Sequence, residues 1–343
     1  MPLSYIEKSN FFKVLETLTS EFEVFVPRRS EKELHFEKFN HEKISEYTFA
    51  EYRTSQPPRS FFSQAKENVS AYFANKPRLH EKPRLIVGLK ACDLKSFKVQ
   101  DFVFADTALK DPTYTQRRDR AVIISSDCTA FKDVCYCVHL GDLPYPKIGF
   151  DLNLSEVRGG YILEGLTQTG NELLKKFESH LENVTQEHLT MRDRQREDLV
   201  NKLKNAVESS GMPTADTWQS LVIKGFNSGI WDKWAAFCVE CGACTQSCPT
   251  CHCFLLYDAA SGKSGFMRNR IWDSCQFYAF AKVAGGANPR SRLSARLRNR
   301  YDKKFNFFKD VLGLYACTGC GRCIEACLGK IDMREVFKDL ARI

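Results

Sequence analysis

Continuous apolar runs, and the spacing between them, predict a parallel sheet in the first part of the chain. Residues 84–88 and 121–125 are short and largely apolar, which is typical of strands buried on both faces. Residues 93–100, between them, have helical spacing, so the three segments predict a βαβ unit with its loops at one edge. Residues 23–27 predict another strand, ended by its proline, and residues 61–73 have apolar positions at helical spacing.

Polar patterns with helical spacing follow in residues 161–209, and the charged stretch 183–208 is the longest of them. Cysteines and helix-forming residues dominate from about residue 231. We therefore expect an α+β protein, with an N-terminal α/β domain followed by a helical C-terminal domain. The C-terminal part holds two runs of four closely spaced cysteines, which is typical of ferredoxins with two clusters, so we expect an α-helical ferredoxin-type dicluster domain there. The expected bounds are 1–160 for the α/β domain, 161–230 for a helical spacer and 231–343 for the ferredoxin domain.

Two runs of four cysteines share the spacing C-x2-C-x2-C-x3-C. They are Cys238, Cys241, Cys244 and Cys248, and then Cys317, Cys320, Cys323 and Cys327. In two-cluster ferredoxins with this spacing, three cysteines hold one [4Fe–4S] cluster and the fourth serves its neighbour. One cluster is therefore expected on Cys238, Cys241, Cys244 and Cys327, and the other on Cys317, Cys320, Cys323 and Cys248. The alternative, structural zinc, normally uses two separated cysteine pairs.

Residues between and beside the runs refine this prediction. The runs are separated by 68 residues, from Pro249 to Ala316, so we expect helices to brace the clusters. Gly242, Gly319 and Gly321 allow tight turns that direct backbone N–H groups at sulfur. Leu328 stands where a proline usually follows the last cysteine.

Four further cysteines lie in the N-terminal half. Cys92 and Cys128 each follow a predicted strand, and Cys135 and Cys137 form a C-x-C pair. Thiols that converge at one sheet edge suit a third [4Fe–4S] cluster, although free cysteines also occur as small buried apolar side chains.

The last three cysteines, Cys251, Cys253 and Cys275, have no evident fourth partner. We expect them, and His252, to pack beside a cluster or to hydrogen-bond near it rather than to bind iron.

Composition and charge narrow the class of protein. Fifteen cysteines in 343 residues is an odd and clustered set, which argues against a secreted disulfide framework. No signal-peptide pattern and no apolar stretch of ~18 residues is found, so we expect a cytoplasmic protein without a membrane span.

Residues 231–343 hold 18 Lys and Arg against 10 Asp and Glu, whereas the rest of the chain is neutral. Each oxidised cluster with its thiolates carries about −2, so we expect much of this basic charge to compensate the clusters.

An arginine-rich tract between the runs allows three interpretations. It contains Arg290, Arg292, Arg296, Arg298 and Arg300, followed by Lys303 and Lys304. A solvated helix face that offsets cluster charge is favoured, followed by docking to an acidic protein, whereas nucleic-acid binding is not expected.

No nucleotide-binding glycine motif and no metalloprotease histidine pair is present, so no catalytic residue is nominated and hydride chemistry is expected on another subunit.

The ordered motifs resemble one family of iron–sulfur subunits. Residues 87–94, Asp127-Cys128 and Cys135-Tyr136-Cys137 resemble its N-terminal signature, and the two runs with residues 272–275 resemble its C-terminal one. The family comprises β subunits of cytoplasmic nickel–iron sulfhydrogenases, A subunits of anaerobic sulfite reductases and related subunits beside flavin and heterodisulfide-reductase modules. The resemblance implies an electron relay between an FAD/NAD(P)-binding oxidoreductase subunit and a hydrogenase, sulfite-reductase or heterodisulfide-reductase-like module.

Two other functions remain open at the level of sequence. A catalytic subunit would reduce an inorganic sulfur compound or a disulfide at its own N-terminal cluster, and a cleft beside Cys135 and Cys137 would favour it. An iron–sulfur protein that binds nucleic acid through the arginine tract would show salt-sensitive retention on DNA or RNA.

Overall fold

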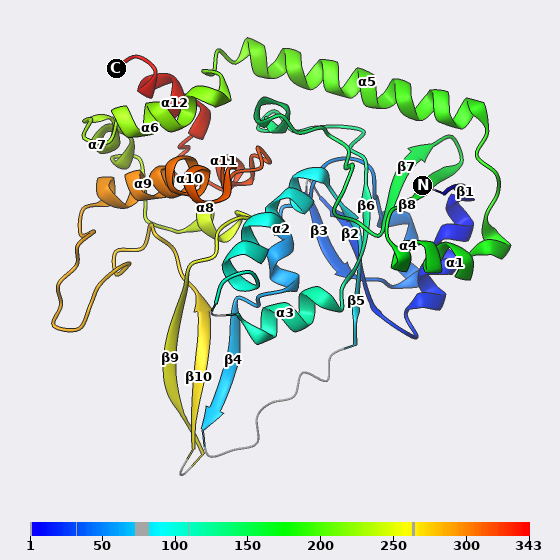
Figure 1. Cartoon of the computed structure of the whole chain (residues 1–343), viewed down its shortest axis with the longest axis horizontal. Coiled ribbons are helices and arrows are strands. Elements are labelled where there is room, and N and C mark those ends of the chain that lie inside the picture. Colours follow the sequence, from blue (N-terminus) through cyan, green and yellow to red (C-terminus); the bar gives the residue numbers. More distant parts are fainter. Residues whose placement is uncertain (1, 32, 73–81, 109, 263–264) are drawn as a thin grey trace.

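A seven-stranded mixed sheet forms the N-terminal half of the chain (Figure 1). The computed structural model describes residues 2–343 except 32, 73–81, 109 and 263–264. Within these residues the strand order is β1-β8-β7-β6-β5-β2-β3. The central strands β2, β5, β6 and β7 run parallel, and β1, β8 and β3 pair antiparallel at the two sides. The strand bounds are β1 Leu3–Glu7, β2 Glu23–Ser30, β3 Glu33–Lys38, β5 Arg84–Leu89, β6 Val122–Ser126, β7 Leu152–Val157 and β8 Gly160–Gly165.

Helices cover both faces of this sheet, which explains the continuous apolar strands. In β5, Leu85 and Val87 pack into the core that α1 (Lys8–Leu18) and α4 (Gln168–Lys176) close. Ile86, between them, packs into the opposite core beneath α2 (Ala91–Phe104) and α3 (Pro112–Asp119). Strands buried on both faces need apolar residues at every position rather than at alternate ones.

The expected α+β architecture and the βαβ unit are confirmed. The strands expected at 84–88 and 121–125 are β5 and β6, the helix expected at 93–100 is α2, and β5 pairs in parallel with β6. The sheet also continues past residue 160, because β8 pairs with both β7 and β1.

A long charged helix connects the sheet to the cysteine-rich part. This helix, α5 (Gln186–Ser209), crosses the top of the molecule in Figure 1 and is the one that the polar pattern predicts. The C-terminal helices are α6 Trp218–Lys224, α7 Ile230–Ala235, α8 Ala243–Gln246, α9 Leu293–Asp302, α10 Phe308–Leu312, α11 Arg322–Glu325 and α12 Met333–Leu340. Trp218 of α6 stacks on Phe337 of α12, with 4.3 Å between ring centroids, and so joins the helices around one aromatic core. None of the helices described is long and apolar enough to cross a membrane.

A second, three-stranded sheet departs from the sequence prediction. It consists of β4 (Lys66–Tyr72), β10 (Gly265–Trp272) and β9 (Phe254–Ser261), and it projects below the body in Figure 1. The helix predicted for residues 61–73 is wrong, because most of that segment is β4, while Phe73 lies outside the described residues. Likewise the stretch between the cysteine runs, expected to be helical, contains the β9–β10 hairpin. Strand β4 depends on β10, a partner distant in sequence that local spacing does not reveal, whereas β9 pairs with β10, the next strand in the chain.

Strand β2 also differs from its prediction, since it continues through Pro27 to Ser30. Its pairing with β5 ends at Phe25, before the proline, and only the pairing with β3 continues beyond it. A proline has no N–H to donate, so it is tolerated in a strand at a position where no donor to the ladder is needed.

Glu67 anchors the three-stranded sheet to the N-terminal domain. Its carboxylate is buried and accepts hydrogen bonds from Arg117 of α3 at 2.6 Å and from Arg270 of β10 at 2.5 Å. Arg270 also forms an ion pair with Asp111. One buried carboxylate therefore neutralises guanidinium groups from two elements.

Glu67→Gln is expected to loosen this sheet selectively. Removing the charge leaves buried guanidinium groups undercompensated, so the free energy of opening of the β4 and β10 amides should fall by about 3 kcal/mol. Hydrogen exchange measures that opening. The control is Asp258→Asn, because Asp258 and Arg268 form an ion pair on the same sheet with side chains 46% and 41% exposed. Such a pair contributes about 1 kcal/mol or less, so equal protection losses in the two variants would contradict the assignment of Glu67 as the anchor.

Candidate metal centres

The two cysteine runs adopt the same backbone conformation. Gly242 and Gly321 occupy equivalent positions in the runs, both have φ of 71°, and each directly precedes a short helix, α8 or α11. Gly319 also has positive φ, at 64°. The left-handed turns expected at these three glycines are therefore present, and the sequence repeat is a structural repeat.

The first cavity brings together cysteines from both runs. We call Cys238, Cys241, Cys244 and Cys327 cluster site 1, and these four line a cavity of about 520 Å³. Cys327 Sγ also accepts a hydrogen bond from the backbone N–H of Ile331 at 3.3 Å. Three thiols of the first run thus face the fourth thiol of the second run.

The second cavity has the reciprocal composition. We call Cys317, Cys320, Cys323 and Cys248 cluster site 2, and these four line a cavity of about 280 Å³. Cys323 lines both cavities, so the two sites are neighbours. The exchange of the fourth cysteine that the spacing predicts is therefore the arrangement that the chain adopts around its cavities.

The four N-terminal cysteines also gather. We call Cys92, Cys128, Cys135 and Cys137 cluster site 3. Cys92 lies at the start of α2 and Cys128 just after β6, so both follow the carboxyl ends of parallel neighbouring strands. Burial raises the pKa of Cys137 well above its ordinary value, and the charges of Cys128 and Cys135 raise it further. Cys92 has Cys128 among its electrostatic neighbours as well.

Burial favours the protonated form of these N-terminal thiols. It raises the pKa of Cys128 to about 12, although the ammonium group of Lys90 acts in the opposite direction. Lys90 is itself buried and donates to the carbonyls of Phe49 and Asp127 at 2.5 and 3.0 Å. Binding of iron at such a site must release protons, because only thiolates are ligands.

The C-x-C segment connects site 3 to site 2 directly. Tyr136, between its two cysteines, donates its backbone N–H to the carbonyl of Gly319 at 2.8 Å, and its hydroxyl lies 3.2 Å from Cys317 Sγ. A Cβ on Gly319 would lie 2.6 Å from the Cα of Cys137, so only glycine permits this approach. Sites 3, 2 and 1 therefore follow one another through contacting segments.

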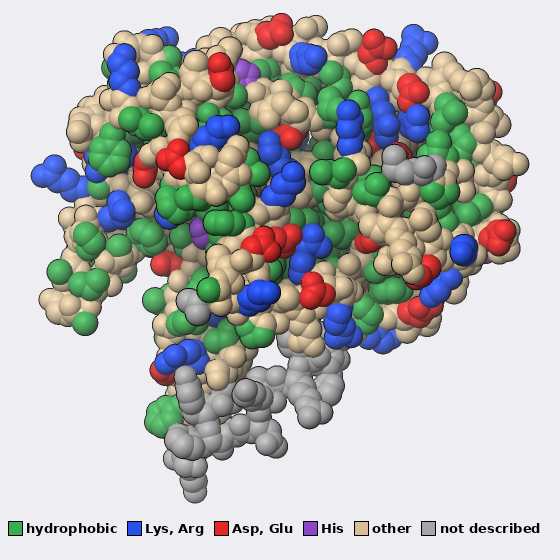
Figure 2. Space-filling view, in the orientation of Figure 1, with side chains coloured by type: hydrophobic (Ala, Val, Ile, Leu, Met, Phe, Trp, Pro, Cys, Tyr) green, Lys and Arg blue, Asp and Glu red, His purple; other side chains and the backbone are tan. Residues whose placement is uncertain are grey.

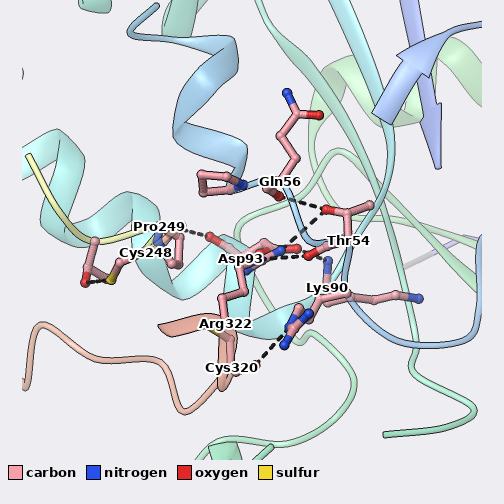
Figure 3. Close-up of polar contacts among 12 residues, drawn as sticks. Thr54, Gln56, Lys90, Asp93, Cys248, Pro249, Cys320 and Arg322 are labelled. Carbon is pink, nitrogen blue, oxygen red and sulfur yellow. Dashed lines mark hydrogen bonds and ion pairs between the residues drawn. The ribbon is translucent and has the colours of Figure 1, made fainter. Parts of the chain in front are cut away.

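Ion pairs lock the N-terminal domain onto the second run. Figure 3 shows Arg322 between Asp93 and Thr54, with its guanidinium 2.7 Å from the Asp93 carboxylate and 2.8 Å from the Thr54 carbonyl. Arg53 donates to the carbonyl of Cys320 at 2.9 Å and pairs with Glu325 at 2.7 Å. Arg322 and Asp93 are both buried, so this interface holds its charges without water.

Buried cations surround the cysteines in unusual number. Among the described residues, seven buried Lys or Arg side chains lie on cluster-site segments or bond to them, namely Arg53, Arg59, Lys90, Arg296, Arg300, Lys304 and Arg322. A buried cation is stable only where negative charge or hydrogen-bond acceptors compensate it. Carboxylates or backbone carbonyls compensate most of these cations, whereas Arg300 and Lys304 lie against cysteine sulfur atoms.

The cavities fit [4Fe–4S] clusters on the chemistry of their walls. The four thiols of each site line its cavity, which is the usual number of ligands of the cluster, and Cys323 of site 2 also lines the cavity of site 1. Arg300 lines both cavities, and its buried Nη2 atom has no hydrogen-bond partner among the described residues. A sulfide of a cluster bound in either cavity would be a hydrogen-bond acceptor for this nitrogen. Across the described part of the chain, no three His, Cys, Asp or Glu side chains lie close enough to bind one metal ion together. This spacing is compatible with a [4Fe–4S] cluster, because each thiolate binds a different iron atom of the cluster.

Cys251 lies beside a candidate ligand. A hydrogen bond from the Cys251 thiol lowers the pKa of Cys248 well below its ordinary value, and the charge of Lys304 lowers it further despite burial. The same bond and burial raise the pKa of Cys251. Cys248 and Cys251 therefore interact closely, and Lys304 lies against Cys248.

The other residues of uncertain role lie nearby. Cys253 and Cys275 are electrostatic neighbours of one another, and Cys275 also neighbours Cys244. His252 is half-buried, its Nδ1 lies 3.1 Å from the Thr250 carbonyl, and desolvation lowers its pKa to about 4. It is a neutral hydrogen-bonded neighbour in this environment.

The arginine-rich tract is divided between surface and interior. Arg296, Arg300 and Lys304 are buried, whereas Arg292 and Arg298 are more exposed, so the tract is not simply a solvated face. The three buried cations recur every four residues, which is one face of a helix, and this spacing is the signal that points to them in the sequence. On the face drawn in Figure 2, Lys and Arg side chains are interspersed with Asp and Glu.

Comparison with known proteins agrees with this geometry. A family model described as a 4Fe-4S dicluster domain matches residues 237–331. The sulfhydrogenase 2 subunit beta of Pyrococcus furiosus is 30% identical over 319 residues, which cover 92% of each chain. The chain belongs to the sulfhydrogenase β-subunit family. A further 127-residue match, 28% identical, covers 35% of this chain and 9% of the pyruvate-flavodoxin oxidoreductase of Rhodospirillum rubrum.

The resemblance stated from the motifs is thus confirmed. Membership in the sulfhydrogenase β-subunit family, together with the dicluster match, makes this chain an iron–sulfur electron-transfer subunit that uses [4Fe–4S] clusters. The family also accounts for motifs at both ends of the chain, since the relative aligns over nearly its whole length.

Gly319→Ala is expected to disrupt site 3 while leaving the fold intact. The added methyl would meet the backbone of Cys137 and push the C-x-C segment away, so iron content should fall by about four atoms per chain. Gly313→Ala is the matched control, because Gly313 has a similar φ of 70° but open space around an added Cβ. Both variants carry the same backbone strain of about 1–2 kcal/mol. Iron analysis after anaerobic purification gives the comparison, and equal iron in the two variants would show that the approach of Gly319 does not support a metal site.

Proposed function

We propose that this chain relays electrons through three [4Fe–4S] clusters within a multi-subunit oxidoreductase. The observation that carries the proposal is that cysteines of both runs line each C-terminal cavity. Three cysteines of the first run lie with Cys327 in one cavity and three of the second run lie with Cys248 in the other, while Cys323 also lines the first. Cytoplasmic location, an FAD/NAD(P)-binding partner subunit and a terminal hydrogenase, sulfite-reductase or heterodisulfide-reductase-like module belong to the same proposal. The relative from Pyrococcus furiosus, a sulfhydrogenase subunit by name, favours a hydrogenase among these modules.

The twelve proposed ligands divide among the three sites as defined above. A [4Fe–4S] cluster supplies one-electron chemistry at potentials that its surroundings set. The chain contributes the thiols, the buried cations that stabilise their charge, and the short backbone contacts between sites. We assign no acid, base or nucleophile, since electron relay needs none.

The packing supports an order in which site 2 lies between the other two. Cys135 and Cys92 of site 3 both have Cys320 of site 2 as an electrostatic neighbour. Site 2 in turn shares Cys323 and Arg300 with the wall of site 1. Electron transfer slows steeply with distance, so this order gives the shortest steps.

Site 1 is the candidate point of exchange with a partner protein. Cys241 is exposed, and around site 1 the side chains of Phe237, Val239 and Leu328 are 55%, 60% and 70% exposed. Gly329 packs on the Phe237 carbonyl, where an added Cβ would lie 1.9 Å from the oxygen, so the two segments are adjacent. We call Phe237, Val239 and Leu328 the site 1 rim. Exposed apolar residues around a redox site are typical of a surface that another protein covers.

A catalytic role at site 3 is the alternative function. A surface cleft opens beside this site, between the start of α2 at Ala91 and the loop from Gly141 to Gly149. Its walls carry Lys95, Lys98 and Lys147, which would suit an anionic substrate. The described cleft lining includes Ala91 but not the site 3 cysteines themselves, and this favours relay over direct reduction of a substrate.

Anaerobic native purification with identification of the co-purifying subunits tests the proposal most directly. A flavin subunit together with a hydrogenase or related module would support the relay and name its reaction. Recovery of the chain alone, able to reduce a sulfur compound with a chemical donor, would instead establish the catalytic alternative.

Serine substitutions at the fourth cysteines test the reciprocal ligand sets. Cys327→Ser should abolish the same cluster signal in electron paramagnetic resonance as Cys241→Ser, and Cys248→Ser the same signal as Cys320→Ser. Each variant should lose about four iron atoms of an expected total of about twelve. Cys253→Ser is the control and should keep all of its iron. If Cys327→Ser instead matched Cys320→Ser, each run would serve its own cluster and the assignment would be wrong.

Charge placed on the site 1 rim is expected to slow electron exchange with the partner. Val239→Glu and Leu328→Glu should lower the rate of partner-dependent reduction at least tenfold while iron content stays complete, because a buried unpaired carboxylate disfavours the complex. Ile148→Glu adds the same charge at an apolar residue 62% exposed, in the cleft beside site 3. A slower rate in Ile148→Glu with normal rates in both rim variants would move the point of exchange to site 3.

A further inference from the structure

Lys304 lies in the turn between two C-terminal helices, and it is not one of the proposed cluster ligands. It sits in the π-helical turn Lys303–Phe307, which joins α9 to α10. Such turns are uncommon and often mark functional positions. Here the turn buries Lys304 at 5% exposure, while its neighbour Lys303 remains exposed.

The Lys304 ammonium group binds one wall of site 2. Its Nζ lies 3.3 Å from Cys248 Sγ, 2.7 Å from Thr250 Oγ1 and 2.8 Å from the carbonyl of Ala316. Ala316 directly precedes Cys317, so one ammonium group joins the cysteine from the first run to the start of the second. Lys304 lines the site 2 cavity and is absent from the described lining of site 1.

Arg300, one helical turn earlier, lies differently. It lines both cavities, and its Nη1 lies 3.7 Å from Cys251 Sγ. Cys244 of site 1 and Cys323 of site 2 are both among its electrostatic neighbours. The two cations are therefore not equivalent, because Arg300 is shared and Lys304 belongs to site 2.

We propose that Lys304 sets the driving force for electron transfer between sites 1 and 2. The inference rests on the proposed function, in that both sites hold clusters. Reduction adds a negative charge to a cluster, and a nearby cation stabilises that charge and raises the reduction potential. Arg300 raises both potentials together and leaves their difference largely unchanged. Lys304 raises only that of site 2, so it draws the electron from site 1 to site 2.

Lys304→Met tests this with the side-chain length kept and the charge removed. An opposite charge in contact with an ionisable group typically changes its equilibrium by tenfold or more. The variant should shift the distribution of an electron between the two sites about tenfold toward site 1, which corresponds to 59 mV for one electron. Redox titration followed by electron paramagnetic resonance measures both midpoints, and the site 2 signal is the one that Cys320→Ser lacks.

Three further variants separate this electrostatic role from a structural one. Lys303→Met removes the same charge from the adjacent exposed residue and should move neither midpoint. Arg300→Gln should lower both midpoints and change their difference less than Lys304→Met does. Lys304→Arg keeps the charge and should restore most of the wild-type difference.

The outcomes distinguish this inference from the function on which it rests. Lys304→Met with full iron and an unchanged difference between midpoints would overturn the inference alone. If Lys304→Met lost iron, the titrations of Arg300→Gln and Lys304→Arg would test the inference instead. Unchanged midpoints in Arg300→Gln, together with a changed difference between midpoints in Lys304→Arg, would overturn the inference. Absence of both clusters from the wild-type chain would overturn the proposed function and this inference with it.

Discussion

The architecture depends on compensating the basic side chains that the chain buries around its cysteines. Buried cations without enough buried carboxylates are unstable unless other anions face them. Around the cysteines the chain buries Lys90, Arg300, Lys304 and other basic side chains, whereas Asp93 and Asp127 are the buried carboxylates of that region among the described residues. The buried cations and the cysteine sulfur atoms therefore stabilise one another. This interaction explains why the C-terminal third of the chain is basic while the rest is neutral.

The same constraint determines how the two halves of the chain meet. Arg322 belongs to the second cysteine run, yet its carboxylate partner, Asp93, follows Cys92 in the N-terminal domain. The sheet places that carboxylate accurately, because α2 begins directly after the buried strand β5. The apolar packing of the sheet thus determines the position of the Asp93 carboxylate at the domain interface, although those apolar residues take no part in electron transfer. The N-terminal domain is in this sense part of the iron–sulfur apparatus rather than an appendage to it.

Sequence patterns were most informative where the determinants are local. Cysteine spacing predicted which thiols share a cavity, since a run of close ligands constrains its own backbone, and the apolar runs at β5 and β6 predicted the βαβ unit. The helix predicted over β4 was wrong because β4 is stabilised by β10, about two hundred residues later in the chain. The role of the arginine-rich tract was also underestimated, because burial of Arg300 and Lys304 depends on where α9 packs and not on the charges of the tract alone.

Electron relay further requires that the sites approach without obstruction, and glycine makes this possible here. Gly319 and Gly321 belong to the second run, and Cβ atoms on them would lie within 2.6 Å of Cys137 and Val134 atoms, respectively. The two residues act as turns for their own site and as the contact surface for the C-x-C segment of the other. A larger residue would preserve the cysteine spacing but separate the sites. The short path between sites 2 and 3 is therefore encoded in residues that bind no metal, which is why ligand motifs alone do not describe a relay.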